Sequence, residues 1–377
     1  MSVLKPIPVE ELSLGVAGGF AESVQPEDLV YFLLNVGDGD AQLIILPERD
    51  GKRELIVVDV ASFDKMKSLI EELRLKSLLP EGDELEFSVA VATHPHRDHI
   101  GGMGKFLLEY RVSELWEPGY YLASSAFINM SKAAAGRSNV SLPTSGHQRR
   151  FGLVYLTVLA PSVALRHRFD TYGIEINDSS LTLMIEYPKA RVVKRYNERV
   201  DLGRRRGNRL LLGADAQTTS WAQVAIDFPA LQRRTSWLAG QLGSLQGADY
   251  LRADVFKVPH HASKHGVNLE LAERVAPRLS LVSCAANGAK FRFPHDLAQE
   301  ILREARHPTA TSGGMRPADH KIGIHYTSDS CIDETGAVFP LGSIALVVGQ
   351  GTHDLKLWRM LDDIGAPIDL DAARYIG

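Results

Sequence analysis

The chain has few cysteines and no long apolar segment. Only Cys284 and Cys331 occur among the 377 residues, and neither belongs to a CxxC pair. Two isolated cysteines exclude a disulfide framework and argue against a thiolate zinc site. No apolar run is long enough to span a bilayer, and the N-terminus has no basic segment followed by a long apolar one. We therefore expect a cytoplasmic protein with neither a membrane span nor a secretory signal.

The chain also lacks an excess of positive charge. The formal net charge is −4, so nothing draws the whole molecule toward nucleic acid or an anionic membrane. Any polyanion would have to bind at a local patch. No repeat and no Gly-, Ser- or Pro-rich linker divides the sequence. We expect an N-terminal extension over 1–27 and one domain over 28–377, which includes a C-terminal elaboration.

Apolar runs and amphipathic segments alternate irregularly along the chain. Runs of adjacent strands mixed with helices indicate a layered α/β sandwich rather than a simple alternation of strand and helix. The turn-rich GDGDA stretch after the first strand predicts a hairpin. The expected strands include 29–36, 41–47, 54–60, 87–94, 153–161, 180–188, 208–216 and a run from 254, and the expected helices are 63–79, 269–278, 295–306 and most of 217–250.

A dense group of histidines follows one of these strands. THPHRDH contains His94, His96, Asp98 and His99, directly after the apolar strand 87–94. A strand end is a rigid support, and the loop after it can fold these side chains toward one point. Neutral imidazoles and carboxylates are good ligands for zinc, manganese or iron. Gly101 and Gly102, which follow the group, are expected to let the backbone turn tightly beside such a site.

Further ligands must come from other strand ends. Asp215 ends the apolar run LLLGAD, although a turn or helix-capping aspartate is an equally good interpretation of that residue alone. His260 and His261 follow the apolar run VFKVP. Alternation along a strand would place these two side chains on opposite faces, and we favour His260 because it is nearer the strand end.

Together these residues resemble the metallo-β-lactamase fold family. The family signature HxHxDH is matched by His94, His96, Asp98 and His99. The resemblance implies a four-layered αββα sandwich and a pair of metal ions. It further implies an aspartate that supports the ligands, matched by Asp59, a bridging aspartate, matched by Asp215, and a closing histidine, matched by His260 or His261. Asp98 and Asp215 would then be the catalytic aspartates.

Four ordered motifs resemble more closely the metallo-hydrolase domain of competence-type DNA-uptake proteins. They are VGDGDA at 36–41, NDSSL at 177–181, LLLGAD at 210–215 and KVPHHASKHG at 257–266. The uptake proteins also have long membrane segments, and this sequence has none. It therefore resembles a soluble relative, and the resemblance implies a phosphodiester substrate in nucleic acid or a nucleotide.

The sequence departs from the family pattern at one ligand. Many members place a histidine between HxHxDH and the bridging aspartate, and no histidine here has a matching context. NDSSL occupies that place, so Asn177 or Asp178 is expected to supply an oxygen ligand. An oxygen ligand shifts the preference toward manganese, so we expect two divalent ions, with zinc first and manganese as the alternative. A late histidine of the branch is replaced by Phe293, and His295 lies two residues further on.

Residues near the doublet and a basic stretch are candidates for substrate binding. The resemblance places Ser263 behind the ligands and turns Lys264 and His265 toward substrate, although Ser263 could equally cap a helix. The stretch 188–208 is rich in arginine, including Arg204, Arg205 and Arg206, and could form a hairpin that tracks a phosphate backbone. A solvated hairpin tip that carries charge for solubility explains the same stretch equally simply. The scattered histidines after residue 305 are expected to be surface or core residues.

Three functions remain open from the sequence. The first is a metal-dependent phosphodiesterase or nuclease that uses a metal-activated water. The second is a metallo-hydrolase of an ester, thioester, lactone or lactam with the same ligands and a different pocket. The third is a non-catalytic relative that keeps the fold to bind a partner, for which the missing histidine is the only hint.

Overall fold

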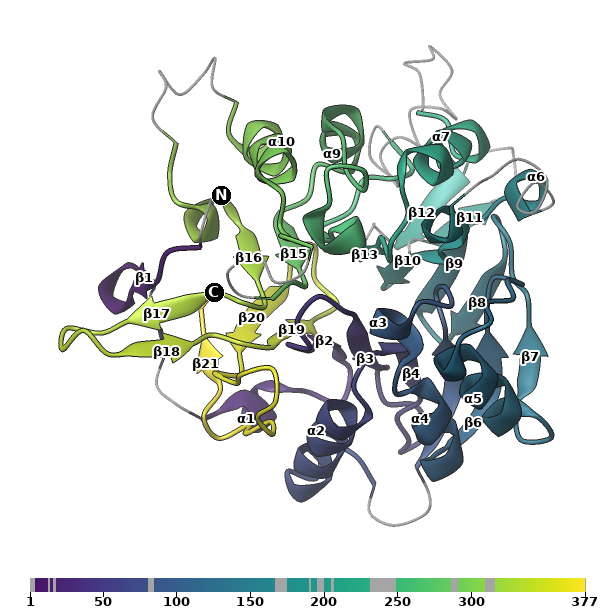
Figure 1. The fold of residues 1–377 in the computed structure, drawn as a ribbon, viewed down its shortest axis with the longest axis horizontal. Coiled ribbons are helices and arrows are strands. Elements are labelled where there is room, and N and C mark those ends of the chain that lie inside the picture. Colours follow the sequence, from purple (N-terminus) through teal and green to yellow (C-terminus); the bar gives the residue numbers. More distant parts are fainter. Residues whose placement is uncertain are drawn as a thin grey trace.

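Two large β-sheets form the centre of the protein, and helices lie on both sides of them (Figure 1). The computed structural model describes residues 4–376, apart from 13, 16–17, 81–84, 167–174, 190, 195–199, 205–206, 231–248, 286–290 and 309–315. Its two termini lie on the same side of the molecule in this view.

The first sheet has nine strands. Their order across the sheet is β21-β20-β19-β2-β3-β4-β5-β6-β7, and strands β4 to β7 run parallel to one another. The predicted hairpin is confirmed, because β2 and β3 pair antiparallel across GDGDA. The bounds are β2 Leu29–Leu33, β3 Ala41–Ile45, β4 Leu55–Val60, β5 Glu86–Val91, β6 Arg111–Trp116, β7 Asn139–Ser141, β19 Ile344–Val348, β20 Leu355–Arg359 and β21 Arg374–Tyr375.

The second sheet has seven strands, in the order β16-β15-β14-β13-β10-β9-β8. Strands β13 to β16 are parallel, and β8 to β10 are antiparallel. The bounds are β8 Gln148–Phe151, β9 Val154–Ala160, β10 Thr182–Tyr187, β13 Asn208–Leu212, β14 Val255–Lys257, β15 Leu279–Val282 and β16 Ile324–Tyr326.

Helices cover the outer face of each sheet, and the two inner faces pack together. Strand β2 shows why: Leu29, Tyr31 and Leu33 pack in the core between the sheets, whereas Val30 and Phe32 pack under the helices of the first sheet. The four-layered αββα sandwich predicted from the sequence is therefore confirmed. The helices over the first sheet are α2 Phe63–Leu75, α4 Met103–Glu109 and α5 Ser125–Ala134, and those over the second are α7 Thr218–Asp227, α9 Leu269–Val275 and α10 Asp296–Arg306.

Shorter elements decorate this sandwich. In the N-terminal region, strand β1 pairs with β17 of a small three-stranded sheet, so it lies against the C-terminal elaboration. Within the basic stretch 188–208, β11 and β12 form a separate antiparallel pair. None of the helices in the described part of the chain is both long and apolar enough to cross a membrane. The bounds are β1 Ile7–Pro8, η1 Val9–Glu11, α1 Phe20–Ser23, α6 Val163–Arg166, β11 Arg191–Lys194, β12 Val200–Arg204, η5 Asp319–Ile322, β17 Ser330–Ile332 and β18 Val338–Pro340.

A buried arginine joins the C-terminal strands. The Arg359 guanidinium donates to the backbone oxygens of Tyr326 (2.6 Å) and Gly342 (3.0 Å) and pairs with Asp329 at 3.3 Å. His325, on β16, is buried near it. Burial, with the charges of Arg359 and His320, lowers the pKa of His325 to about 3. This imidazole therefore stays neutral in the folded protein at mildly acidic pH.

His325 should make the protein less stable in acid. The unfolded chain takes up the proton near the ordinary pKa of 6.5, whereas the folded chain does so only near 3. Stability is therefore complete above about pH 6.5 and is lost as the pH falls toward about 3. We expect His325→Leu to reduce the slope of unfolding free energy against pH by up to about 1.4 kcal/mol per unit between pH 6 and pH 4. Urea titrations across this range measure it, with His307→Gln as control, and equal slopes in His325→Leu and the wild type would contradict it.

Candidate metal centre

The predicted ligands of the first motif lie at the carboxyl ends of parallel strands. Strand β4 carries Asp59 as its penultimate residue, and β5 leads through Thr93 to His94. The short helix α3 (Arg97–Ile100) then carries Asp98 and His99 in its single turn. In Figure 1, α3 lies between the helices of the two outer layers. The loops that follow the strands therefore converge at one edge of the sandwich.

Glycines near the motif are required by close packing rather than by an unusual turn. Gly101 and Gly102 have φ values of −55° and −97°, which any residue can adopt. A Cβ on Gly102 would collide with the backbone nitrogen of Phe63, and one on Gly39 would lie 2.6 Å from the carbonyl oxygen of Asp98. The expected turn at 101–102 is present between α3 and α4, but its backbone angles do not need glycine, and what the glycines permit is contact between neighbouring loops.

His99 lies at the centre of the cluster. Its Nδ1 is 2.7 Å from Asp59 Oδ2, and its Nε2 is 3.1 Å from Asp215 Oδ1. Thr93 donates its backbone N–H and its hydroxyl to Asp59, at 2.8 and 2.7 Å, which fixes that carboxylate behind the imidazole. On the other side, His94 Nε2 lies 3.8 Å from Asp215 Oδ2 and 3.1 Å from His96 Nδ1.

The histidine doublet completes the group from the second sheet. Strand β14 ends at Lys257, so His260 and His261 lie beyond it, in the turn η4 (Pro259–Ala262) with φ values of 51° and 53°. His261 Nε2 lies 3.6 Å from Asp215 Oδ1, and His260 Nε2 lies 3.8 Å from Asp215 Oδ2. The predicted placement on opposite faces of a strand is wrong, because this left-handed turn directs both imidazoles toward the same aspartate.

The two carboxylate oxygens of Asp215 divide the cluster into two groups. Near Oδ2 are His94 and His260, with His96 beside His94. Near Oδ1 are His99 and His261, and Asp98 Oδ2 lies 4.0 Å from His261 Nε2. The structure therefore brings together all the residues of the HxHxDH motif, Asp215 and both histidines of the doublet.

The NDSSL segment places one residue beside the cluster and another against helix α7. Asn177, in the turn η3 (Ile176–Ser179), has its Nδ2 3.4 Å from His260 Nε2. Asp178 faces away from the cluster, because its Oδ1 accepts the backbone N–H of Ser220 at 3.0 Å in the first turn of α7. Of these two residues, only Asn177 adjoins the group near Oδ2 of Asp215.

The donor atoms of the cluster suit a cation. His99 Nε2, His261 Nε2 and Asp215 Oδ1 are buried, and none of the three has a hydrogen-bond partner in the described part of the chain. Unsatisfied buried polar atoms are costly, and these three face one another. Three groups of described residues have ligand atoms close enough to hold one ion: His94, His99 and Asp215; Asp98, His99 and His261; and Asp40, Asp59 and His99.

The charged groups of the cluster strongly shift one another's pKa values. Burial raises the pKa of Asp215, but the imidazoles of His99 and His261 outweigh it and hold that pKa well below its ordinary value. Burial lowers the pKa of His99, but Asp215 and Asp59 raise it well above its usual value. Burial lowers the pKa of His94 well below its usual value, and Asp215 offsets only part of this shift. The carboxylate of Asp215 is therefore ionised and available as a ligand.

A buried ion pair that the sequence analysis missed adjoins the cluster next to His261. Asp40, from the first hairpin, pairs with Lys257 at the end of β14 and accepts the hydroxyl of Ser283. Ser283 lies 3.1 Å, through its Oγ, from His261 Nδ1. Both charged residues are completely buried. A sequence signal exists in hindsight, because Asp40 and Lys257 are charged residues beside apolar strands and lie within two of the quoted motifs.

The remaining predicted residues have varied positions. Ser263 is buried in the turn after the doublet, where its backbone N–H donates to His260 O at 2.7 Å, while Lys264 and His265 are exposed beside it. Arg204 ends β12, and Arg205 and Arg206 lie outside the described residues. Arg209, just after the stretch 188–208, is buried, and its guanidinium lies 3.4 Å from Glu186.

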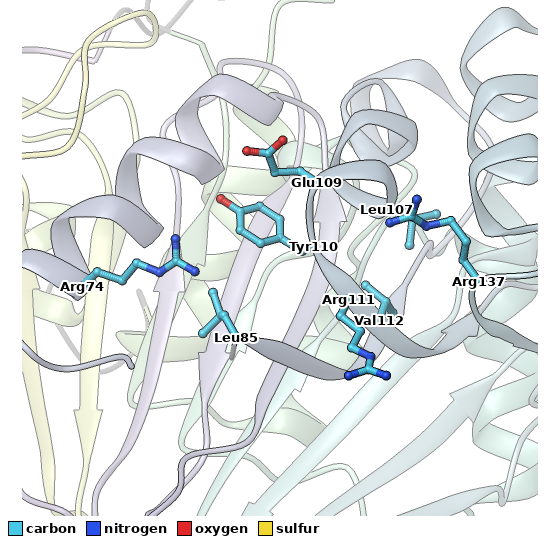
Figure 2. A pocket seen from close by; sticks show the side chains of 8 residues that line it. All are labelled: Arg74, Leu85, Leu107, Glu109, Tyr110, Arg111, Val112 and Arg137. Atoms are coloured by element: carbon cyan, nitrogen blue, oxygen red, sulfur yellow. The ribbon is translucent and has the colours of Figure 1, made fainter. Parts of the chain in front are cut away.

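The cavity in Figure 2 lies at the opposite edge of the first sheet. It has a volume of about 550 Å³ and is lined by Arg74, Tyr110, Arg111 and five other residues, none of which is a predicted ligand. Leu85 and Arg111 stand at the amino ends of β5 and β6, whereas the cluster lies at the carboxyl ends of the strands. This cavity is therefore separate from the candidate metal centre.

Comparisons with known proteins identify only structural similarities. No family model matches the chain, and no curated protein matches it. Similar structures include a mutant of the CmlA β-hydroxylase of Streptomyces venezuelae, with 16% identity over 77% of this chain and a TM-score of 0.35. Another is the metallo-β-lactamase fold protein YhfI from Bacillus subtilis, with 10% identity over 73% of this chain and 93% of that one and a TM-score of 0.36. A third is yeast PDE1, with 11% identity over 80% of this chain and 98% of that one and a TM-score of 0.42. The chain spans about half, 52%, of the length of CmlA.

Proposed function

We propose that this chain is a metal-dependent hydrolase of phosphodiesters, built on a metallo-β-lactamase-like αββα sandwich. The observation that carries the proposal is the set of three buried donor atoms, on His99, His261 and Asp215, which face one another without hydrogen-bond partners in the described part of the chain. A buried arrangement of this kind is satisfied by a divalent cation.

The residues present fit two ions that share Asp215. His94, His96 and His260 would hold one ion through the Oδ2 side, and Asp98, His99 and His261 would hold the other through the Oδ1 side. In this proposal His260 takes the place of the missing family histidine, and Asn177 adds an oxygen beside it. Seven of these ligands, five imidazoles and two carboxylates, are donors that suit zinc first, with manganese as the alternative. Such ions supply a hydroxide nucleophile at neutral pH and stabilise developing negative charge.

The chain's own contribution is to orient the imidazoles. The Asp59 carboxylate fixes Nδ1 of His99, so Nε2 faces Asp215. The carbonyl oxygen of Ser283 lies 3.0 Å from Nδ1 of His261 and fixes the second imidazole in the same way. Carboxylates and carbonyls behind a ligating histidine set its tautomer and raise its basicity. We assign this supporting role to Asp59 and Ser283, whereas Ser263 shapes the turn of the doublet.

The substrate class rests on the four ordered motifs that resemble those of the DNA-uptake branch, and on the charge at the rim. Lys264, His265 and Arg97 are exposed beside the cluster and could contact phosphates. Hydrolysis of an ester, thioester, lactone or lactam remains the alternative, because the same ligands serve that chemistry. A non-catalytic binding role fits less well, because every residue of the HxHxDH motif is retained. His94 and His99 lie against Asp215, His96 lies beside His94, and Asp98 lies beside His261.

Metal content and hydrolysis should be lost together in the double variant Asp98→Ala/His99→Ala. We expect the wild type to hold about two ions per chain and to hydrolyse bis-p-nitrophenyl phosphate. The double variant removes two ligands of one ion group, and the His99 ring also lies 4.1 Å from that of His94 in the other group. The variant should hold fewer ions and show no activity above background. Elemental analysis and nitrophenolate release measure the two effects.

The surface variant Asp371→Ala is the matched control, because its ion pair with Lys76 is exposed and should contribute little. Metal without phosphodiester cleavage, but with cleavage of an ester or lactam, would move the assignment to the alternative. No metal after reconstitution with zinc and manganese would reject both enzyme functions.

A further inference from the structure

The wall of the candidate metal centre beside the doublet is aromatic. Phe293 is nearly buried, and its ring centroid lies 5.4 Å from that of His260 and 5.5 Å from that of His261. It occupies the position at which the resembling branch has a histidine. A phenyl ring cannot bind a metal ion, so this residue gives the site an apolar side instead of another ligand.

A second ring extends this wall to the surface. Phe291 stacks on Phe293 with a centroid distance of 5.8 Å and an interplanar angle of 26°, and half of its area (50%) is exposed. The three aromatic groups, from the doublet through Phe293 to Phe291, therefore run from the buried cluster to solvent. The exposed half of Phe291 is therefore open to a ligand that approaches the cluster from this side.

We propose that Phe291 is a stacking platform for a nucleobase, which makes the substrate a nucleotide or a nucleic-acid strand. The inference rests on the proposed phosphodiesterase function and narrows its substrate. Bases have flat aromatic faces, and a ring already held by a second ring loses little conformational freedom on binding one. A base on Phe291 lies one ring beyond Phe293, so the sugar-phosphate next to it can reach the cluster.

Positive charge on the same loops complements this platform. Arg292 is exposed between the two phenylalanines, and Lys264 and His265 are exposed just after the doublet. The loops are joined, because the Lys264 backbone N–H donates to His295 Nδ1 at 2.9 Å and the His295 N–H donates to Ala262 O at 3.0 Å. Binding of single strands combines such cations, which follow the phosphates, with aromatic rings that stack on the bases.

Binding of a fluorescein-labelled oligothymidylate and of an abasic oligomer of equal length tests the platform. The two probes share their phosphates and differ in the bases. Fluorescence anisotropy with the full chain, without added divalent cation, measures affinity independently of hydrolysis. We expect the wild type to bind the oligothymidylate about tenfold more tightly than the abasic probe, because each stacked base contributes roughly this factor or more. Phe291→Ala should remove the difference, and Phe291→Tyr should retain it.

Phe339→Ala is the matched control, since Phe339 is similarly exposed (45%) on β18 of the small three-stranded sheet. It should leave the ratio unchanged. Equal wild-type affinity for the two probes, or a ratio that survives in Phe291→Ala, would overturn the platform. Release of nitrophenolate from bis-p-nitrophenyl phosphate, measured separately, reports on the hydrolase itself, so failure of the platform and failure of the proposed function give different results.

Discussion

Replacing Lys257 by methionine is expected to lower the free energy of unfolding by about 3–5 kcal/mol. Lys257 and Asp40 are both completely buried, and the ammonium is the closest positive charge to that carboxylate. Burial raises the pKa of Asp40, but Lys257, followed by His99 and His261, brings it below its ordinary value. Without Lys257, the carboxylate would remain buried with little compensation.

Urea denaturation followed by tryptophan fluorescence measures the change. The double variant Asp40→Asn/Lys257→Met is the control, because it removes both charges of the pair and leaves neither one buried without its partner. We expect it to recover most of the loss, since neutral replacement of a whole buried pair is often close to neutral in stability. A single variant as stable as the wild type, or a double variant worse than the single, would show that the pair does not stabilise the fold.

Replacing Asp215 by asparagine is expected to weaken binding of both metal ions by more than about 100-fold and to abolish hydrolysis. Loss of a residue that only supports a ligand already costs about 10–100-fold in metal affinity, and Asp215 contacts both ligand groups directly. Asparagine preserves the shape of the side chain and removes only its charge and one oxygen. Titration calorimetry with zinc and with manganese measures the loss.

The two histidines of the doublet provide graded controls. His260→Ala should lose one ion, from the group near Oδ2, and His261→Ala should lose the other, so each variant keeps about one ion per chain. Asp215→Asn should keep neither at the same metal concentration. Binding of two ions by Asp215→Asn with wild-type affinity would reject the shared aspartate, and retention of both ions in His260→Ala would return the role of the missing histidine to Asn177.

The layers and the strand ends were predictable because they depend on local patterns. The apolar run 54–60 corresponds to β4, and the run 87–94 overlaps β5 and delivers His94 as expected. Boundaries were less accurate. The helix predicted over 63–79 ends at Leu75, because Ser77 adopts a positive φ of 57° that no glycine announces in the sequence. Part of the helical segment predicted over 217–250 is confirmed as α7, and 231–248 lies outside the described residues.

The site was predictable in composition and less so in geometry. Spacing identified HxHxDH, but the direction of each side chain depends on turns that spacing does not determine. The doublet shows this, because consecutive left-handed residues bring both imidazoles to Asp215. Lys257 was missed for a related reason: a buried lysine next to an apolar run indicates a partner, but only the packing of the two sheets identifies it as Asp40, 217 residues away.

The division of the cluster between the two sheets has a consequence for folding. His94 and His99 follow a strand of the first sheet, whereas Asp215 and the doublet follow strands of the second. Neither half can assemble the centre alone, so it exists only after the halves dock. A ligand that binds only the docked state stabilises it by mass action, by about 2.7 kcal/mol at a hundred times its dissociation constant. If the proposed ions bind there, cellular metal supply would set how long the newly made chain resists proteolysis, apart from any effect on turnover.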